Sequence, residues 1–182
     1  MELYIIIGIV VLLFIYVLVS YNGLVKLSNS VKEAFSTMDV YLKKRWDLIP
    51  NIVETVKGYA KYERETLESV VKLRNSAYDK MSQNDKMVAN DEISGVLSKL
   101  MALSENYPDL KANQNFLDLS SQLAKIEEDI ANARKYYNAV VKNLNNKVQM
   151  FPSNIIAKLF GYQEMEMFEI TEREKENIKV EL

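Results

Sequence analysis

The chain of 182 residues contains no cysteine and no histidine. Without cysteine it cannot form disulfides, thiolate-ligated zinc sites or a cysteine nucleophile. Without histidine it lacks the side chain that serves most often as a general base near neutral pH and as a transition-metal ligand. The missing cysteines do not identify a compartment, because reducing and oxidising environments both tolerate such a chain. We therefore expect no catalytic residue, no cofactor and no metal.

Glycine and proline are scarce, with five and three residues respectively. These two residues interrupt helices most strongly. Long stretches of apolar residues recur at helical spacing, and no segment shows the alternation typical of a strand. The sequence predicts an all-α protein. A glycine-rich phosphate loop is also missing from the sequence, which excludes nucleotide binding by that route.

Neither sign of charge dominates, since 23 basic residues face 25 acidic ones. All the basic residues and all the acidic residues except Glu2 follow the first 25 positions. So close a balance gives the chain no overall field that would attract a polyanion. We expect no nucleic acid among its partners.

One long apolar run is present at the N-terminus. As a helix, residues 3–25 would be roughly 35 Å long, enough to cross a hydrocarbon core of about 30 Å. Tyr4 and Tyr21 lie where interfacial aromatic anchors occur. A cleaved signal peptide is the alternative, but the sequence supplies neither a positive n-region nor a good cleavage site. We predict a retained anchor that contacts the lipid bilayer through residues 3–25.

Basic residues follow this run and predict its orientation. Lys26, Lys32, Lys43, Lys44 and Arg45 come within about twenty residues of the span. The positive-inside rule then places the N-terminus outside and the remaining chain in the cytoplasm. We predict a single-pass protein of the cell (inner) membrane.

We expect three parts: a transmembrane anchor at 1–25, a helical bundle domain at 26–162 and an acidic C-terminal tail at 163–182. The spacing predicts helices over 26–46, 48–82, 87–106 and 113–148, the first continuing the anchor without a break. Together they would form an antiparallel four-helix bundle. The most regular apolar seam follows steps of three and four residues. Its members are Phe116, Leu119, Leu123, Ile126, Ile130, Ala133, Tyr137, Val140 and Leu144.

Three breaks separate these helices. Asp47 can cap a new helix in which Pro50 occupies the first turn, so we favour a hairpin there; a kink at Pro50 within one long helix is the alternative. Residues 83–85 are expected to form a loop and residues 106–109 a turn before Pro108. Residues 151–153 form the third break, with Ser153 as the N-cap of a short helix that ends at Gly161.

Four segments resemble the LemA family. They are LKKRWDLIPNIVETVKGY at 42–59, YPDLKANQNF at 107–116, ARKYYN at 133–138 and FPSN at 151–154. They occur in the family's order, and the likeness covers nearly the whole chain. The resemblance implies an N-terminal membrane anchor and a helical bundle in a bacterial or archaeal protein, with no established reaction or ligand. Trp46 stands where the family often has histidine or tyrosine, so no role for an imidazole is carried over.

Lys43, Lys44, Arg45 and Trp46 form the compact basic and aromatic cluster of the sequence. Such a cluster could contact a partner or an anion, with the indole as a cation–π platform. A solvated helix end is the competing interpretation. The acidic run at 127–129 is expected to be a solvated helix face, because di-metal bundles require histidine.

Ile155, Ile156, Leu159 and Phe160 form an apolar face on barely two helical turns. Such a face must be covered, either by the end of the bundle or by a partner or the bilayer. Glu63 and Arg74 interrupt the apolar series of the second helix and either reach solvent or pair with facing helices. The tail carries seven acidic and three basic residues, a composition typical of a mobile end. The alternative is that Phe168, Ile170, Ile178 and Val180 let part of it pack as an extended strand.

These features predict a membrane-anchored helical bundle that acts as a protein-interaction module or scaffold and has no catalytic activity. An auxiliary subunit of a membrane enzyme is one alternative. A ligand-sensing bundle that signals along its first helix is another. We expect a protein partner, but the sequence identifies neither that partner nor the oligomeric state.

Overall fold

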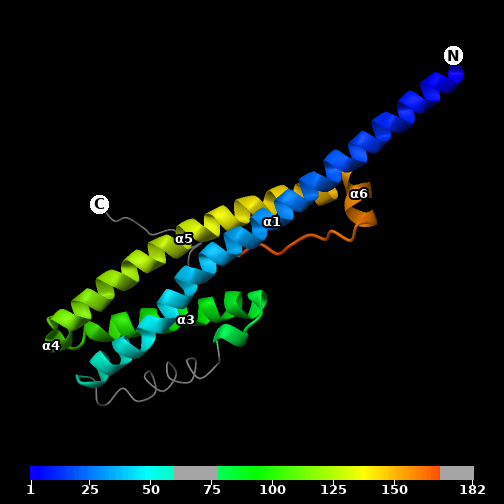
Figure 1. Ribbon diagram of the computed structural model, residues 1–182. Helices are drawn as coiled ribbons and strands as arrows, with labels where there is room; N and C mark the ends of the chain where they lie inside the picture. The colour runs from blue at the N-terminus through cyan, green and yellow to red at the C-terminus, as the bar shows by residue number, and fades with distance from the viewer. Residues whose placement is uncertain (60–77, 169–182) are drawn as a thin grey trace, which may run out of the picture. The chain divides into compact units, whose positions relative to one another are not determined.

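The computed structural model describes residues 1–59 and 78–168. The described residues form helices and no strands, which confirms the all-α prediction. The elements are α1 (Glu2–Lys57), the 3-10 helix η1 (Tyr78–Lys80), α3 (Gln83–Ser104), α4 (Pro108–Lys111), α5 (Gln114–Gln149) and α6 (Ser153–Leu159), as drawn in Figure 1. The number of helices in the bundle stays a prediction, and Glu63 and Arg74 lie outside the described residues.

Helix α1 continues the apolar N-terminal run into the folded body without a break, as predicted. The predicted end at Trp46 and the hairpin at Asp47 are wrong, because α1 passes through Pro50 and ends at Lys57. Proline inside a helix removes one hydrogen bond and costs about 3 kcal/mol. On both sides of Pro50 the helix buries large apolar side chains, which offset that cost. They are Trp46, Ile49, Ile52, Val53 and Val56.

Helix α3 starts at Gln83, so the loop predicted at 83–85 is wrong. Ser82 is the N-cap: its hydroxyl accepts a hydrogen bond from the Asp85 amide at 3.2 Å, and the Asp85 carboxylate accepts one from the Ser82 amide at 3.2 Å. This reciprocal capping box pairs the free donors of the first turn. Proline at the first position of α4 turns the predicted 106–109 break into a short helix.

Helix α5 agrees with the predicted range of 113–148 to within one residue at each end. Helix α6 begins at Ser153 with Pro152 as its N-cap, so Ser153 is not the cap that was predicted. Its hydroxyl instead donates to the carbonyl oxygens of Lys147 and Met150. Gly161 follows α6 with a φ of 75°, a backbone conformation suited to glycine at a helix end.

The chain divides into two compact units. The first contains residues 1–38 and 133–168, and therefore the start of α1, the second half of α5, and α6. Its core joins α1 to α5, and the rings of Phe35 and Tyr137 meet edge to face at 5.9 Å. The buried apolar side chains of this unit are Leu24, Val31, Ala34, Phe35, Met38, Ala133, Tyr137, Val140, Val141, Leu144, Ile156, Ala157 and Phe168.

Residues 163–168 pack on α5 in extended conformation, so the mobile end expected from composition is wrong for this part of the tail. The side-chain amide of Asn145 pairs with the backbone of Met165 through two hydrogen bonds of 2.9 Å. The amide of Asn138 pairs in the same way with Phe168, at 2.9 and 2.8 Å. Two asparagine side chains, seven residues apart on α5, therefore bind the backbone of residues 165 and 168 through paired hydrogen bonds, as a neighbouring β-strand does.

The second unit includes residues 39–132, and so the end of α1, η1, α3, α4 and the first half of α5. Its interior is mostly apolar, and the buried polar side chains among its described residues are Arg45 of α1 and Asn90 and Ser104 of α3. The buried apolar side chains are Leu42, Trp46, Ile49, Ile52, Val53, Val56, Tyr78, Ala89, Ile93, Leu97, Leu100, Leu110, Phe116, Leu123 and Ile130.

Candidate functional site

The four residues predicted as one basic and aromatic cluster point in different directions. Successive residues of a helix are turned by about 100°, so neighbours in sequence do not share a face. Arg45 and Trp46 are buried, whereas Lys43 is partly exposed and Lys44 is exposed. The structure therefore leaves two of the four, Lys43 and Lys44, accessible for the predicted partner or anion contact.

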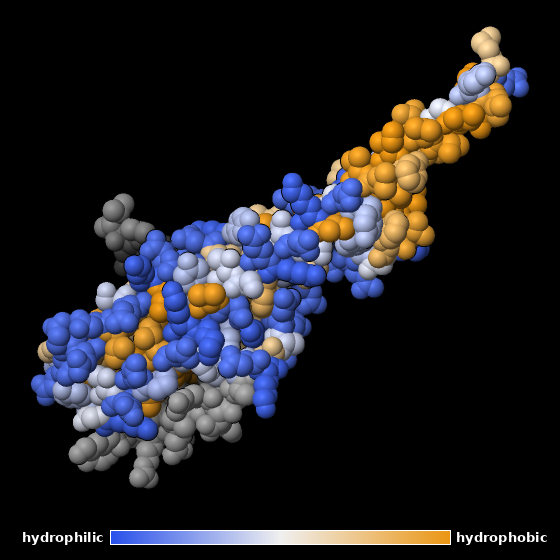
Figure 2. Space-filling view, in the orientation of Figure 1, coloured by the Kyte–Doolittle hydropathy of each residue, from blue (hydrophilic) through white to orange (hydrophobic). Residues whose placement is uncertain are grey.

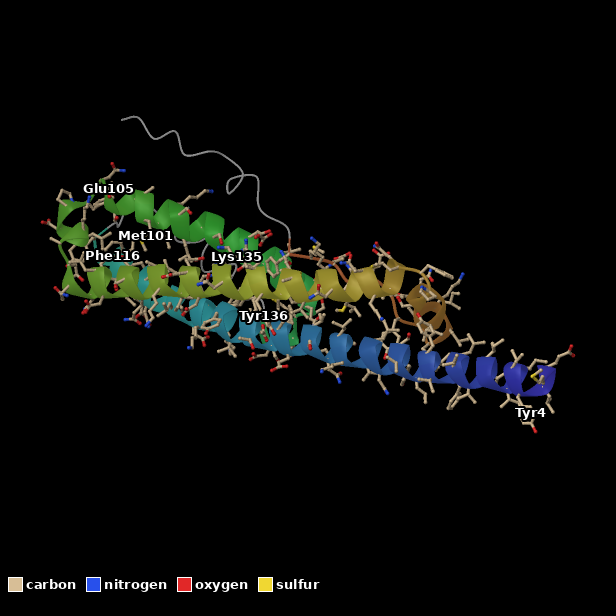
Figure 3. All side chains as sticks on the ribbon, turned by 90° about the horizontal axis from the view of Figure 1, so that it is seen from above. Tyr4, Met101, Glu105, Phe116, Lys135 and Tyr136 are labelled. Carbon is tan, nitrogen blue, oxygen red and sulfur yellow. The ribbon has the colours of Figure 1, made fainter. Side chains whose placement is uncertain are left out.

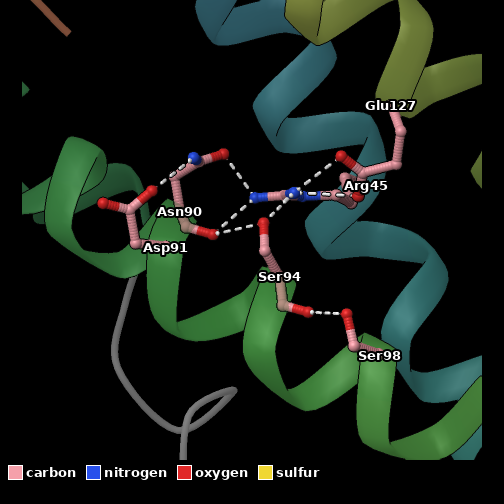
Figure 4. A network of polar contacts seen from close by, with 6 residues as sticks. All are labelled: Arg45, Asn90, Asp91, Ser94, Ser98 and Glu127. Atoms are coloured by element: carbon pink, nitrogen blue, oxygen red, sulfur yellow. Dashed lines mark hydrogen bonds and ion pairs between the residues drawn. The ribbon is translucent and has the colours of Figure 1, made fainter. Parts of the chain in front are cut away.

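Arg45 is the centre of a polar network in the second unit (Figure 4). Its side chain is 1% exposed. One terminal nitrogen donates to the Ser94 hydroxyl at 2.9 Å and to the two Glu127 carboxylate oxygens at 2.8 and 3.1 Å. The other donates to the Asn90 carbonyl at 2.8 Å and to the Asn90 side-chain oxygen. The guanidinium thus joins α1 to α3 and α5 within this unit.

This network gives Glu127 a role that the sequence did not indicate. The acidic run at 127–129 was expected to be a solvated face, but Glu127 forms an ion pair with Arg45. A signal was available in α1: Met38, Leu42, Arg45, Ile49 and Ile52 follow steps of three and four, and all are buried. An arginine on an otherwise apolar stripe predicts a buried cation, which requires an anionic partner.

A second polar cluster surrounds Tyr78 in the same unit. The Tyr78 hydroxyl donates to Asp39 at 2.7 Å, and the Lys86 ammonium donates to the other oxygen of that carboxylate at 2.7 Å. The Tyr78 ring packs against Trp46 with centroids 5.3 Å apart, and the Lys86 nitrogen lies 4.7 Å from its centroid. These contacts bring η1 against α1 and α3 through aromatic and cation–π packing.

Burial raises the pKa of Tyr78 well above its ordinary value, and the hydrogen bond to Asp39 raises it further. Burial also raises the pKa of Tyr137 in the first unit, where its hydroxyl donates to the Glu166 carbonyl at 3.2 Å. A raised pKa keeps both phenols neutral in the folded protein. Their hydroxyls act as hydrogen-bond donors to fixed acceptors, which is a structural role.

Lys43 and Lys44 differ in how far they are already engaged. The Lys43 nitrogen lies 3.6 Å from carboxylate oxygens of both Asp47 and Asp79. The Lys44 nitrogen lies 5.4 Å from the centre of the Tyr41 ring. Two exposed acidic neighbours neutralise Lys43, so Lys44 is the better candidate for an external contact.

The predicted bilayer contact corresponds to the N-terminal part of α1, whose side chains are exposed. Large apolar side chains from Leu3 to Val19 are mostly exposed. Figure 2 shows them as a hydrophobic sleeve, and Figure 3 shows Tyr4 near the tip of this helix. Within the described residues, α1 is the one helix long and apolar enough to cross a membrane. This supports a membrane location.

The apolar face predicted at 155–160 is divided between the interior and the surface. Ile156 is buried in the first unit, together with Ala157, whereas Ile155, Leu159 and Phe160 are exposed. The Phe160 ring nevertheless touches Tyr21 of α1, with centroids 4.6 Å apart. One side of α6 therefore packs on the first unit, and the other side is exposed, so the predicted partner or bilayer contact of this face stays a prediction.

Metal binding has no candidate in the part of the chain that the structure describes. No three acidic side chains there are grouped closely enough to hold an ion. The acidic residue at the Arg45 network is occupied by the guanidinium. The geometry is that of a folded body whose inward-facing charges are paired with one another.

Comparisons with known proteins give one family and a few curated relatives. The model of the LemA family matches residues 34–182. Protein LemA of Metamycoplasma hominis is 28% identical over 161 residues, which cover 86% of this chain and 72% of that protein. Magnetosome protein MamQ 2 of Paramagnetospirillum magneticum is 23% identical over 178 residues, covering 84% of this chain and 65% of its own length. MamQ of Magnetospirillum gryphiswaldense is 21% identical, covering 83% and 65% respectively.

Proposed function

We propose, from the premise that this chain belongs to the LemA family, that it is a single-pass membrane protein whose helical body is a protein-interaction module or scaffold. The observation that carries the proposal is the continuity of α1. Its exposed apolar start and its buried later part belong to one helix, Glu2–Lys57. A helix of this kind connects the folded part of the chain directly to the proposed membrane span, which suits a protein that presents a surface at the membrane.

The interior of the body supports a role in presentation. Arg45 is held by Asn90, Ser94 and Glu127, and Tyr78 by Asp39, so these polar groups stabilise packing. Catalytic acids and bases need to reach a substrate. In the described residues, the groups whose pKa is shifted are two phenols, Tyr78 and Tyr137, and both hydroxyls already donate to protein acceptors. We therefore propose no catalytic activity for this body.

The surface of the body supplies candidate contacts for a partner. Lys44 is exposed next to Tyr41 at the start of the second unit. Tyr136 is exposed on α5 of the first unit, as Figure 3 shows with its neighbour Lys135. Tyrosine and cationic side chains are frequent anchors of protein interfaces. We propose that a protein partner docks at one of these two surfaces.

Site-specific photocrosslinking in cells tests this proposal. A benzophenone amino acid replaces Lys44 in one full-length variant and Tyr136 in another. The matched control carries the probe at Trp46, which is buried two residues from Lys44. We expect one discrete adduct with a second protein from an exposed position and none from the control. If neither exposed position gives a protein adduct, the interaction role is wrong.

A further inference from the structure

The exposed side of α6 and the residues before it form one apolar surface, which we name the α6 lip. Its members are Met150, Phe151, Ile155, Leu159 and Phe160, with exposed fractions of 63, 79, 58, 73 and 48%. We propose that the α6 lip inserts into the interfacial region of the lipid bilayer beside the α1 span. The inference rests on the proposed anchor, because it needs the exposed apolar start of α1, from Leu3 to about Tyr21, to cross that membrane.

The position of the α6 lip along α1 supports the bilayer as its occupant. Tyr21 closes the apolar run, and its ring lies 4.6 Å from Phe160 and 6.4 Å from Tyr162 between centroids. From Leu3 to Tyr21 a helix rises by roughly 27 Å, close to the hydrocarbon thickness of about 30 Å. Tyr21 therefore lies at the boundary between hydrocarbon and headgroups, and Phe160 lies at the same depth.

The pattern of burial along α1 places the α6 lip at the end of the apolar run, at the level of the proposed bilayer surface. Leu18 and Val19 are exposed, whereas Ser20 and Leu24 are buried in the first unit. The packed body therefore begins within the last turns of the apolar run. Figure 2 shows that the hydrophobic surface of α1 continues onto this region without a polar band between them. One continuous apolar surface is most simply covered by one apolar phase.

The charges near the lip suit anionic headgroups. Lys147 and Lys158 lie in or beside this region. One carboxylate lies there as well, that of Glu164, which accepts a hydrogen bond from the Gln149 side chain at 2.7 Å. Lys158 belongs to α6 itself, and the Lys147 side chain approaches Gly23 of α1. An interfacial element typically combines an apolar face with cations of this kind.

The α6 lip is fixed in place because the opposite side of α6 packs in the first unit. Ile156 and Ala157 are buried on the opposite side of α6. The Tyr162 amide donates to the Ala157 carbonyl at 2.9 Å, which closes the end of the helix. Because its inner side is fixed to the first unit, insertion of the lip would set the tilt and depth of that unit at the membrane.

Depth measurements on the full chain in phosphatidylcholine and phosphatidylglycerol vesicles test this inference. The chain has no cysteine, so single cysteines at Leu159, Leu13 and Lys99 can each carry an environment-sensitive fluorophore. We expect the label at 159 to show blue-shifted emission, quenching by headgroup-proximal lipid nitroxides and loss of quenching by aqueous cobalt. The label at 13 reports the span, and the label at 99, an exposed position of α3, reports solvent.

The outcomes separate this inference from the proposed anchor. In one outcome, cobalt quenches the label at 159 as strongly as the label at 99, while the label at 13 is still quenched by lipid nitroxides. This outcome contradicts insertion of the α6 lip and leaves its surface to a protein partner. Aqueous behaviour at both 13 and 159 overturns the anchor and the lip together. Lipid quenching at both positions supports both.

A pair of polar substitutions separates insertion from folding. Ile155→Asn with Leu159→Asn changes exposed side chains, so we expect the melting temperature in detergent to stay unchanged. A fluorophore at Phe151→Cys in this background should move from lipid to water. Val88→Asn, at an exposed apolar position of α3, is the matched control and should leave the Phe151 label in lipid. A Phe151 label that stays in lipid in the double variant contradicts the inference.

Discussion

In the second unit, the guanidinium of Arg45 occupies a position on α1 whose equivalents one turn away are Leu42 and Ile49. Burying a cation is costly unless it is paired and hydrogen-bonded. Here a carboxylate, a hydroxyl, a carbonyl and an amide oxygen all accept from it. Through these contacts the network joins α1 to one face of α3, which carries Asn90 and Ser94, and to the turn of α5 that carries Glu127.

Replacing Arg45 by leucine should destabilise the second unit. Leucine fits an apolar stripe but leaves the buried Asn90 side chain without its cationic donor, and we expect a loss of about 3 kcal/mol. Thermal unfolding of the full chain in detergent, followed by circular dichroism, measures this as a lower melting temperature. Lys44→Leu is the matched control and should change stability by less than about 0.5 kcal/mol. Equal melting temperatures for the two variants would show that the network contributes nothing.

At the level of elements, α1 has two parts whose side chains lie in different environments. Its first part is apolar and exposed, and from Leu24 onward one stripe of it is buried while the rest is polar. Pro50 interrupts its hydrogen bonding without ending it. The reason is tertiary: the buried side chains on both sides of Pro50 contribute more than the lost hydrogen bond costs. Propensity alone would have ended the helix here.

Replacing Pro50 by alanine should stabilise the protein. Alanine restores the backbone donor and removes the clash of the ring with the preceding turn, and the gain is about 2 kcal/mol after the added entropy of the unfolded chain. The same thermal unfolding measurement should show a higher melting temperature. Asn51→Ala, at the exposed neighbouring position, is the control and should shift it much less. A lower melting temperature for Pro50→Ala would show that the ring itself packs usefully.

At the scale of the whole molecule, the described chain has one helix, α1, whose apolar start is exposed and whose later part is packed against other helices. The charge distribution predicts the body in the cytoplasm, since the cations of the positive-inside rule follow the span. The basic interval at 134–158 lies in the first unit and adds cations on the same side of the span.

Orientation can be measured with two single-cysteine variants. Glu2→Cys precedes the span and Lys99→Cys belongs to the exposed face of α3. With the N-terminus outside, a membrane-impermeant maleimide should label position 2 in intact cells and position 99 after lysis alone. Labelling of position 99 in intact cells would reverse the predicted topology. Equal labelling of both variants in lysates controls for reactivity.

Most elements were readable from sequence because their signals are local. The three- and four-residue spacing of α5 predicted its ends to within one residue, and the apolar run predicted the continuous start of α1. Two features that differ from the prediction also have local signals: Ser82 and Asp85 form a capping box at the start of α3, and Arg45 lies on an apolar stripe of α1. A third, the passage of α1 through Pro50, depends on distant packing that spacing does not encode.

The sequence by itself determined the helical class, the apolar span and the family, because periodicity, run length and motif strings are properties of consecutive residues. The tertiary structure decided which side of each helix is used. It turned Arg45 and Trp46 inward while leaving Lys44 outside, and it fixed Ile156 in the core while exposing Leu159. The physical reason is that burial and charge pairing depend on neighbours far apart in the chain, such as Arg45 and Glu127.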